Sequence, residues 1–239
     1  MEPSAGSQEP PVTYRYTFTF ATGETKEVMV RLDAATLTLI QDEQPRPPWT
    51  ALSYHQCPNC PLSQEQHPHC PAALGLRDVV ALFSQSLSYE TVEVCIESGA
   101  RRYAKRTSLQ EALSSLIGLL MVTSGCPVMG KLKPLVRHHL PFAKLEETRY
   151  RVLSMYLLAQ YFVARKGRPP DWTFKHLTPI YQEIGTVNTH FHKRFLEVAK
   201  GDASLNALAI LQMFAKTIAF SNDEDALDDL EALFQPYLQ

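Results

Sequence analysis

The sequence predicts an α+β fold, in which a small N-terminal antiparallel sheet and a hairpin precede a C-terminal helical bundle. Before residue 108, apolar and polar side chains alternate over several short segments, as in half-buried strands. After residue 108, apolar side chains recur with helical spacing. A Pro-rich loop, residues 44–72, interrupts the β region and contains three of the five cysteines. We therefore expect an α+β region at residues 13–107 and a bundle at 108–239, folding as one cooperative unit.

The β region follows a polar tail. Residues 1–12 contain Pro, Ser and Glu and few apolar side chains, which predicts disorder. The stretch TYRYTFTF then alternates aromatic with polar side chains, and KEVMVRL and TLTLI continue the pattern after short turns. The segments ETVEVCIES and RRYAKRT flank the turn signal Ser98-Gly99 and predict a hairpin. The expected strands are residues 13–20, 26–32 and 36–40, which form a meander, and residues 90–98 and 101–107.

Helices dominate the rest of the chain. Pro71 is well placed to open the first one, because proline is favoured at the first helical position. The apolar runs LIGLLMV and MYLLAQYFVA are shorter than the ~20 residues that a bilayer span needs, so we expect no membrane segment. The expected helices are residues 71–85, 108–123, 127–139, 144–165, 173–199, 203–219 and 223–237.

Composition excludes several classes of protein. The net charge of −2 is spread over both signs and gives no field to attract nucleic acid or an anionic membrane. The N-terminus MEPSAGSQEPPV has neither the basic start nor the apolar core of a secretory signal. We expect a soluble cytoplasmic protein, in which cysteines are metal ligands or free thiols rather than disulfides.

The stretch HQCPNCPLSQEQHPHC, residues 55–70, predicts a metal site. Cys57 and Cys60 have the spacing that lets one turn direct both sulfurs at a common centre, and Cys70 follows ten positions later. Each is followed by proline, as is Cys126. We expect Cys70 and Cys126 to precede helices, whose N-termini should lower the thiol pKa and favour the thiolate form that a metal requires.

Two ligand sets satisfy this pattern. In the local set, Cys57, Cys60 and Cys70 are joined by His67 or His69. In the long-range set, Cys126 takes the place of the histidine and ties the Pro-rich loop to the bundle. We favour the long-range set, because Thr123-Ser124-Gly125 breaks one helix and delivers Cys126 to the start of the next. Thiolates select zinc or iron-sulfur clusters, so the expected cofactor is zinc, with a 4Fe-4S cluster as the alternative.

Three functions remain open at this point. The first is a non-enzymatic metal-binding protein of unassigned biological role, and the second is an iron-sulfur or thiol-based redox or sensor protein. The third is an enzyme or small-ligand binder with a pocket in the bundle, formed by His139, Gln160, Tyr161 and Asn188. Gln160 and Asn188 interrupt apolar helical faces, where an unpaired polar group costs about 1–3 kcal/mol. The acidic, amphipathic C-terminal segment also leaves room for a protein partner.

Several stretches resemble an uncharacterised bacterial family that is known as a domain of unknown function. They are HCPAALGL, SLQEALSSLIGLLMVTSGCPVMGKLKPLVRHHLPFA and EETRYRVLSMYLLAQYF, and they include the Cys-Pro-x-Cys-Pro, His-Cys-Pro and Thr-Ser-Gly-Cys-Pro motifs of the chain. The likeness extends over almost the whole sequence. It implies a bacterial cytoplasmic protein, and it brings no established activity, cofactor or catalytic residue.

Overall fold

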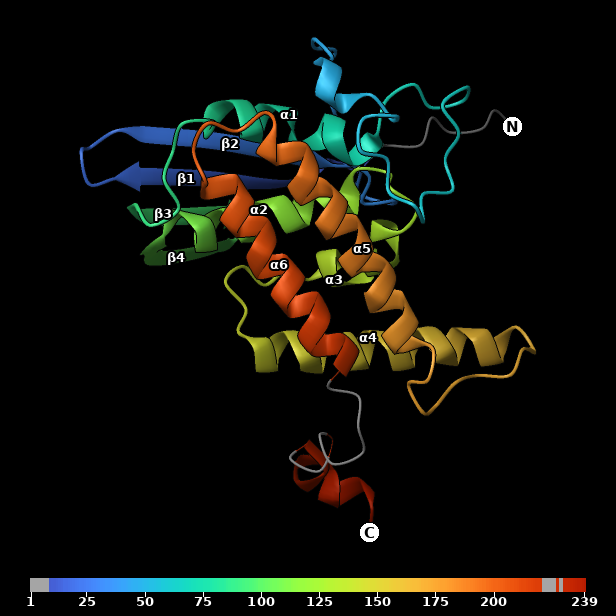
Figure 1. The fold of residues 1–239 in the computed structure, drawn as a ribbon. Helices are drawn as coiled ribbons and strands as arrows, with labels where there is room; N and C mark the ends of the chain where they lie inside the picture. The colour runs from blue at the N-terminus through green and yellow to red at the C-terminus, as the bar shows by residue number, and fades with distance from the viewer. Residues whose placement is uncertain (1–8, 221–226, 228–229) are drawn as a thin grey trace, which may run out of the picture.

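A computed structural model describes residues 9–220, 227 and 230–239, and it has the α+β architecture that the sequence predicts (Figure 1). One antiparallel sheet lies beside a group of helices, and buried residues of both form a single hydrophobic core. Most of the predicted tail, residues 1–8, falls outside the described part of the chain.

The sheet has four strands in the order β2-β1-β3-β4. Tyr16 in the inner strand β1 lies opposite Val28 on one side and Ile96 on the other, so the predicted N-terminal strands and the predicted hairpin join into one sheet. The strands are β1 Val12–Phe20, β2 Thr25–Leu32, β3 Thr91–Ser98 and β4 Arg101–Ser108.

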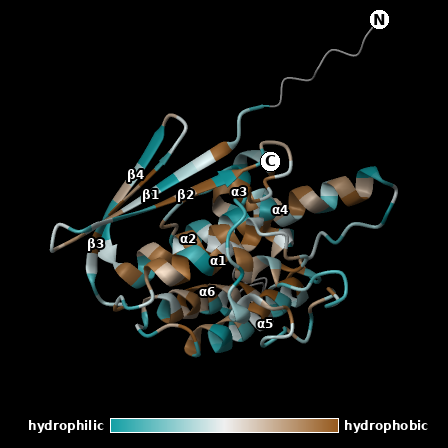
Figure 2. Ribbon diagram, turned by 90° about the horizontal axis from the view of Figure 1, so that it is seen from above, coloured by the Kyte–Doolittle hydropathy of each residue, from teal (hydrophilic) through white to brown (hydrophobic). Residues whose placement is uncertain are grey.

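The aromatic side chains of β1 occupy the buried face of the sheet. Tyr14, Tyr16, Phe18 and Phe20 are each at most 8% exposed, in keeping with their alternation along the strand. Phe18 meets Phe83 edge to face with ring centroids 5.0 Å apart, which joins this face to the end of the first helix. Figure 2 shows the largely polar colouring of β4, the outer strand at the other edge of the sheet.

The predicted third strand of the meander, residues 36–40, is wrong. Asp33 accepts a hydrogen bond from the backbone N–H of Thr36 at 2.7 Å, and Leu37 has a positive φ of 54°. This turn interrupts the ladder, so Leu39 makes only an isolated bridge with Leu32. The N–H of Leu39 donates instead to the carbonyl of Thr123 at 2.9 Å. The segment therefore connects the sheet edge to the helical layer.

Within the described part of the chain, five long helices complete the core (Figure 1). α2 contacts α1 on one side and α6 on the other, and α5 runs beside α6. α4 lies across the end of the α5 and α6 pair. The helices are α1 Pro71–Leu82, α2 Leu109–Thr123, α4 Leu145–Arg165, α5 Leu177–Leu196 and α6 Ala203–Phe220.

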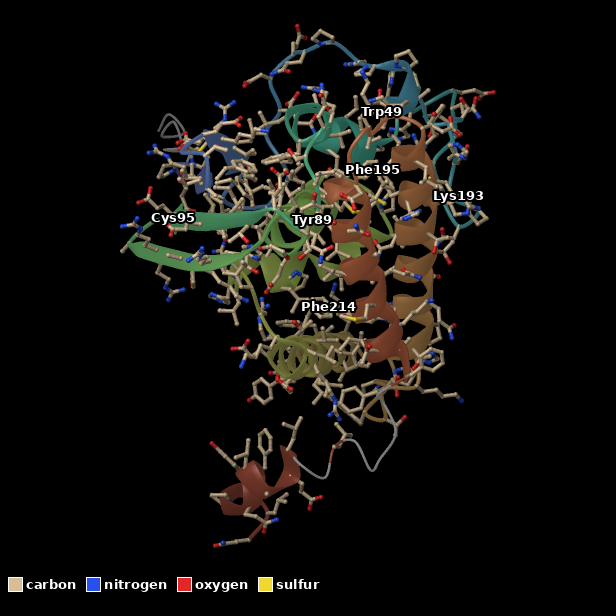
Figure 3. All side chains as sticks on the ribbon, turned by 60° about the vertical axis from the view of Figure 1, so that its left-hand side comes forward. Trp49, Tyr89, Cys95, Lys193, Phe195 and Phe214 are labelled. Atoms are coloured by element: carbon tan, nitrogen blue, oxygen red, sulfur yellow. The ribbon has the colours of Figure 1, made fainter. Side chains whose placement is uncertain are left out.

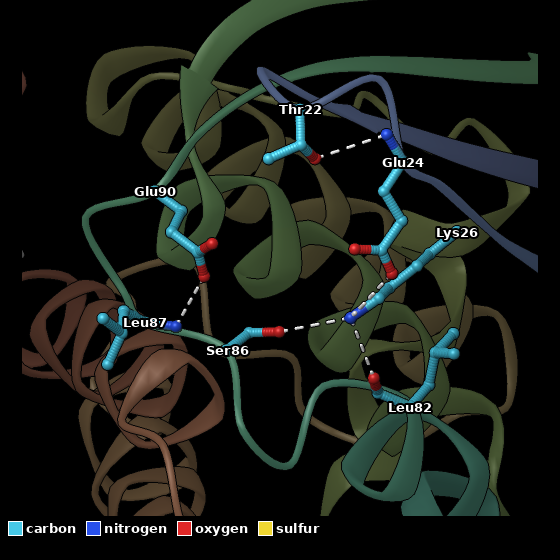
Figure 4. A network of polar contacts seen from close by, with 7 residues as sticks. All are labelled: Thr22, Glu24, Lys26, Leu82, Ser86, Leu87 and Glu90. Atoms are coloured by element: carbon cyan, nitrogen blue, oxygen red, sulfur yellow. Dashed lines mark hydrogen bonds and ion pairs between the residues drawn. The ribbon is translucent and has the colours of Figure 1, made fainter.

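A lysine fastens the outer strand β2 to the end of α1 (Figure 4). The Lys26 ammonium donates to the carbonyl of Leu82 at 3.3 Å and to the hydroxyl of Ser86 at 3.4 Å, and it lies 3.6 Å from the Glu24 carboxylate. The contact with Leu82 satisfies one of the carbonyls that a helix leaves unpaired at its C-terminus.

Two of the predicted helices differ from the structure. Residues 127–139 do not form one helix; a 3-10 turn at Met129–Leu132 leads into the short α3, Lys133–Arg137, because Pro134 lacks the N–H that a continuous helix would use. In the predicted C-terminal helix, residues 223–226 and 228–229 fall outside the described chain, and Ala232–Tyr237 is a 3-10 helix.

α4 and α6 correct two further expectations. The apolar run MYLLAQYFVA would suggest a helix buried on most sides, but Leu158, Tyr161 and Phe162 of α4 are about half exposed. By length and composition, α6 is a candidate membrane span among the described residues, so the expectation that every apolar run is too short is wrong. Buried core helices meet the same criterion, and α6 packs against both α2 and α5.

Candidate metal centre

The Pro-rich loop is held against α5 by a buried arginine. Arg194 is 1% exposed, and its guanidinium donates to the carbonyls of Trp49 at 2.7 Å, Ala51 at 3.0 Å and Leu52 at 3.2 Å. Trp49 also meets Phe195 edge to face, with ring centroids 6.0 Å apart (Figure 3). These contacts order a segment whose prolines exclude a regular helix.

A tight turn presents the first two cysteines. The N–H of Cys60 donates to the carbonyl of Cys57 at 3.0 Å, which closes the turn across Pro58 and Asn59. The Asn59 side chain donates to the carbonyl of Glu183 at 3.0 Å. The turn is thereby fixed on α5, and both thiols face the same side of it, toward a shared cavity.

Cys70 and Cys126 come from two loops that lie side by side. Cys70 is the N-cap residue of α1, and its N–H donates to the carbonyl of Thr50 at 2.8 Å. Cys126 follows Gly125, whose φ of +97° suits glycine and turns the chain sharply. A Cβ at Gly125 would lie 3.8 Å from the Cβ of Pro71, so the two Cys-Pro turns are in contact distance.

The four cysteines and Arg194 line one cavity of about 20 Å³. In the part of the chain that the structure describes, no group of three or more His, Cys, Asp or Glu side chains is already arranged to hold a metal ion. All five cysteines are free thiols. The four sulfurs therefore surround a common space without occupying ligand positions. Apolar side chains form most of the remaining wall: Leu52, Leu62, Pro71, Val128, Val187 and Phe191.

Burial raises the pKa of three thiols in this cavity, those of Cys57, Cys70 and Cys126. It raises the pKa of Cys57 to about 12, and the nearby Cys70 and Cys126 add to the shift. Backbone N–H groups donate to the sulfurs of Cys70 and Cys126 and oppose the shift, yet the pKa of each thiol is raised because burial outweighs them. The expectation that helix starts lower these pKa values is wrong, and the turn after Cys126 is not an α-helix.

The two histidines considered as ligands, His67 and His69, lie outside the cavity. His67 is exposed to solvent. His69 is half-buried, and its Nδ1 is 2.9 Å from the hydroxyl of Thr50. The fifth cysteine, Cys95, is on β3 and accepts a hydrogen bond from Arg102 at 2.9 Å. The structure thus brings together Cys57, Cys60, Cys70 and Cys126, and neither histidine.

The four residues of the predicted bundle pocket divide into two pairs. His139 and Asn188 line one large cavity. Gln160 accepts a hydrogen bond from the N–H of Asp171 at 2.9 Å and fixes the loop after α4. Tyr161 is 50% exposed. Gln160 and Tyr161 do not line the large cavity.

Arg194 is the residue of the site that the sequence prediction misses. It lies between Phe191 and Phe195 on one face of α5, at positions i+3 and i+4. A single arginine in such an apolar stripe is a signal of a buried cation that needs partners.

The family model described as a domain of unknown function (DUF6901) matches residues 12–235. The chain belongs to this family. The match includes the Pro-rich loop, all five cysteines and the helices that line the cavity. No curated protein and no solved structure matches the chain.

Proposed function

We propose that this is a metal-binding protein in which Cys57, Cys60, Cys70 and Cys126 hold one zinc ion. The ion would fasten the Pro-rich loop to the helical bundle. One observation carries the proposal: four thiols from three separate turns line the same small cavity as a buried arginine.

The charge of Arg194 favours an anionic centre beside it. No Asp or Glu of the described residues forms an ion pair with Arg194, and its Nε has no hydrogen-bond partner there. A buried cation is costly unless it is paired. A zinc ion with four thiolates carries two negative charges, one of which this guanidinium would balance.

The size of the cavity favours a single ion. Its volume of about 20 Å³ is close to the smallest space that admits one water molecule, roughly 10–15 Å³. An iron-sulfur cube has eight core atoms and would require the walls to move apart. Zinc is also the ion that closed tetrahedral thiolate sites select when they have a structural role.

The positions of the side chains favour the long-range ligand set. Cys126 lines the cavity, whereas His69 is engaged with Thr50 and His67 is exposed. Because Cys126 belongs to the bundle side of the molecule, this set would crosslink two regions that are distant in sequence. The long loop between Cys70 and Cys126 makes such a crosslink more stabilising than a local one.

Metal binding is expected to reorganise the site. The buried thiols bind protons in the metal-free state, and zinc would replace these protons as it draws the sulfurs into tetrahedral positions. The raised pKa values disfavour the thiol-based redox alternative, because thiolate is the reactive form.

We further propose a non-enzymatic role in the bacterial cytoplasm, with the exposed apolar side chains of α4 as the surface for a protein partner.

Elemental analysis after anaerobic purification tests the proposal. We expect about one zinc per chain in the natural protein and a large loss in Cys57→Ser and Cys126→Ser. Cys95→Ser is the matched control, because this cysteine lies on the sheet and should leave the zinc content unchanged. If the protein instead contains iron and shows broad visible absorbance, the cofactor is an iron-sulfur cluster and not zinc. Full zinc retention in Cys126→Ser would exclude the long-range set.

A further inference from the structure

A second, larger cavity lies against a neighbouring face of α5. It has a volume of about 210 Å³ and is lined by α2, α4, α5, α6 and the segment between α2 and α4. An apolar cavity of roughly 150 Å³ is enough to bind benzene. The space therefore suits a small molecule with one ring or a short alkyl chain. Most of its wall is apolar and includes Leu119, Val136, Ile184, Leu211 and Phe214, the last of which is labelled in Figure 3.

An arginine without an anionic partner lines this cavity. Arg151 is half-buried, and its Nη2 donates to the carbonyls of Leu135 at 2.7 Å and His138 at 3.0 Å. Among the described residues Arg151 forms no ion pair, although the Glu147 carboxylate one turn earlier is near enough to interact with its charge, and its Nε and Nη1 have no hydrogen-bond partner. Glu111 also lines the cavity, but its carboxylate is engaged by Lys105 and Thr107.

Two neighbours of Arg151 are compatible with an anion. His139 is held by the Tyr16 hydroxyl at 2.9 Å, and burial together with the charge of Arg151 lowers its pKa to about 4, so it is neutral near pH 7. Tyr181 is 5% exposed and lines the cavity near the Arg151 guanidinium. Its hydroxyl makes no hydrogen bond with the described residues and is available as a donor.

Asn188 provides a polar group at the far end. It is 2% exposed, and its Oδ1 has no hydrogen-bond partner in the described chain. Asn188 lies seven residues after Tyr181 on α5, which places it about 10 Å further along the helix axis. A buried acceptor of this kind is destabilising unless a donor reaches it.

We propose that this cavity binds a small aromatic or aliphatic carboxylic acid with a hydroxyl group at its distal end. The carboxylate pairs with the free edge of Arg151 and accepts a hydrogen bond from Tyr181. The apolar body fills the space against Leu119 and Phe214, and the distal hydroxyl donates to Asn188. The proposal rests on a different set of side chains from the zinc site, so either can fail without the other.

Calorimetric titration with 3-(4-hydroxyphenyl)propionate tests the proposal, with its uncharged amide as the matched ligand. We expect the acid to bind the natural protein at least tenfold more tightly than the amide, since charged hydrogen bonds are the stronger ones. Arg151→Met should abolish this preference, and Arg165→Met, an exposed arginine on the same helix, should keep it.

A third variant tests where the acid binds without changing the charge of the protein. Ala143→Leu adds volume inside the cavity and should remove binding of both acid and amide, while thermal melting shows that the protein is folded. Absence of acid binding to the natural protein, or equal affinity for acid and amide, would overturn the proposal. The comparison of acid with amide on the natural protein decides the matter even if Arg151→Met does not fold.

Discussion

The two cavities share α5, yet they differ in size, in the side chains that line them and in the segments that form them. Val187 faces the cysteine cavity and Asn188, the next residue, faces the apolar one. Each contains an arginine that has no carboxylate partner among the described residues, but Arg194 is fully buried and Arg151 only partly. The comparison teaches that one helix can position a small polar centre and a large apolar space, provided that each cation receives backbone carbonyls as partners.

Metal removal should give the largest difference between the two cavities, because only the cysteine cavity is proposed to hold a metal. A ligand present at roughly a thousand times its dissociation constant stabilises a fold by about 4 kcal/mol, and we expect a loss of this order when a strong chelator removes zinc. Urea denaturation measures it. Hydrogen exchange should accelerate in residues 44–70 and stay unchanged in β1 and β3. Identical urea midpoints with and without chelator would show that no metal orders the loop.

Arg194→Met should have the next largest effect. It removes the donor from the carbonyls of Trp49, Ala51 and Leu52, and we expect a loss of about 3 kcal/mol, roughly one per unpaired carbonyl. Lys193→Met is the control, because Lys193 is exposed on the same helix (Figure 3) and its loss should change stability by no more than ~0.5 kcal/mol. Equal effects of the two substitutions on the urea midpoint would contradict the role given to Arg194.

His139 should make the apolar side of the molecule sensitive to acid. Its pKa is about 4 in the folded protein, below the usual 6.5, so the unfolded chain binds a proton first as the pH falls. Stability should therefore be complete above pH 6.5 and decline toward pH 4, by on the order of 2 kcal/mol for a partly buried ring. His139→Gln should flatten this part of the curve. A parallel decline in both proteins would show that other groups are responsible.

Asn188→Leu should have the smallest effect, and in the opposite direction. Replacing a buried acceptor that lacks a partner with an apolar side chain of similar size removes a desolvation penalty, so we expect a gain of about 1 kcal/mol in the ligand-free protein. Thermal melting measures the change. A loss of stability would mean that the Asn188 amide is already satisfied in the folded protein.

The sequence predicts the two cavities unequally. Closely spaced cysteines predict which side chains share the small cavity, and Cys126 can be added because it too is followed by proline. The apolar cavity depends on how five segments pack, which no local pattern encodes. Gln160 illustrates the difficulty: its apolar surroundings in sequence suggest burial, but α4 lies at the end of the bundle and leaves Tyr161 and Phe162 half exposed.

The strands and helices are predictable where periodicity is strong, as in β1 and α6, and less so where turns decide the path. Residues 36–40 alternate like a strand, but the side chain of Asp33 and the positive φ of Leu37 turn the chain away from the ladder. Pro134 similarly divides an expected helix. The pKa of Cys70 was beyond sequence reasoning, because the burial that raises it is a tertiary property.

X-ray absorption at the zinc edge tests the central claim most directly. It counts the sulfur and nitrogen atoms that bind the metal in the natural protein, with Zn–S distances of about 2.3 Å and Zn–N distances of about 2.0 Å. The four-cysteine centre predicts four sulfur ligands and no nitrogen, and Cys126→Ser should lose one sulfur or the metal itself. Three sulfurs with one imidazole nitrogen in the natural protein would contradict it, because His67 or His69 would then have taken the place assigned to Cys126.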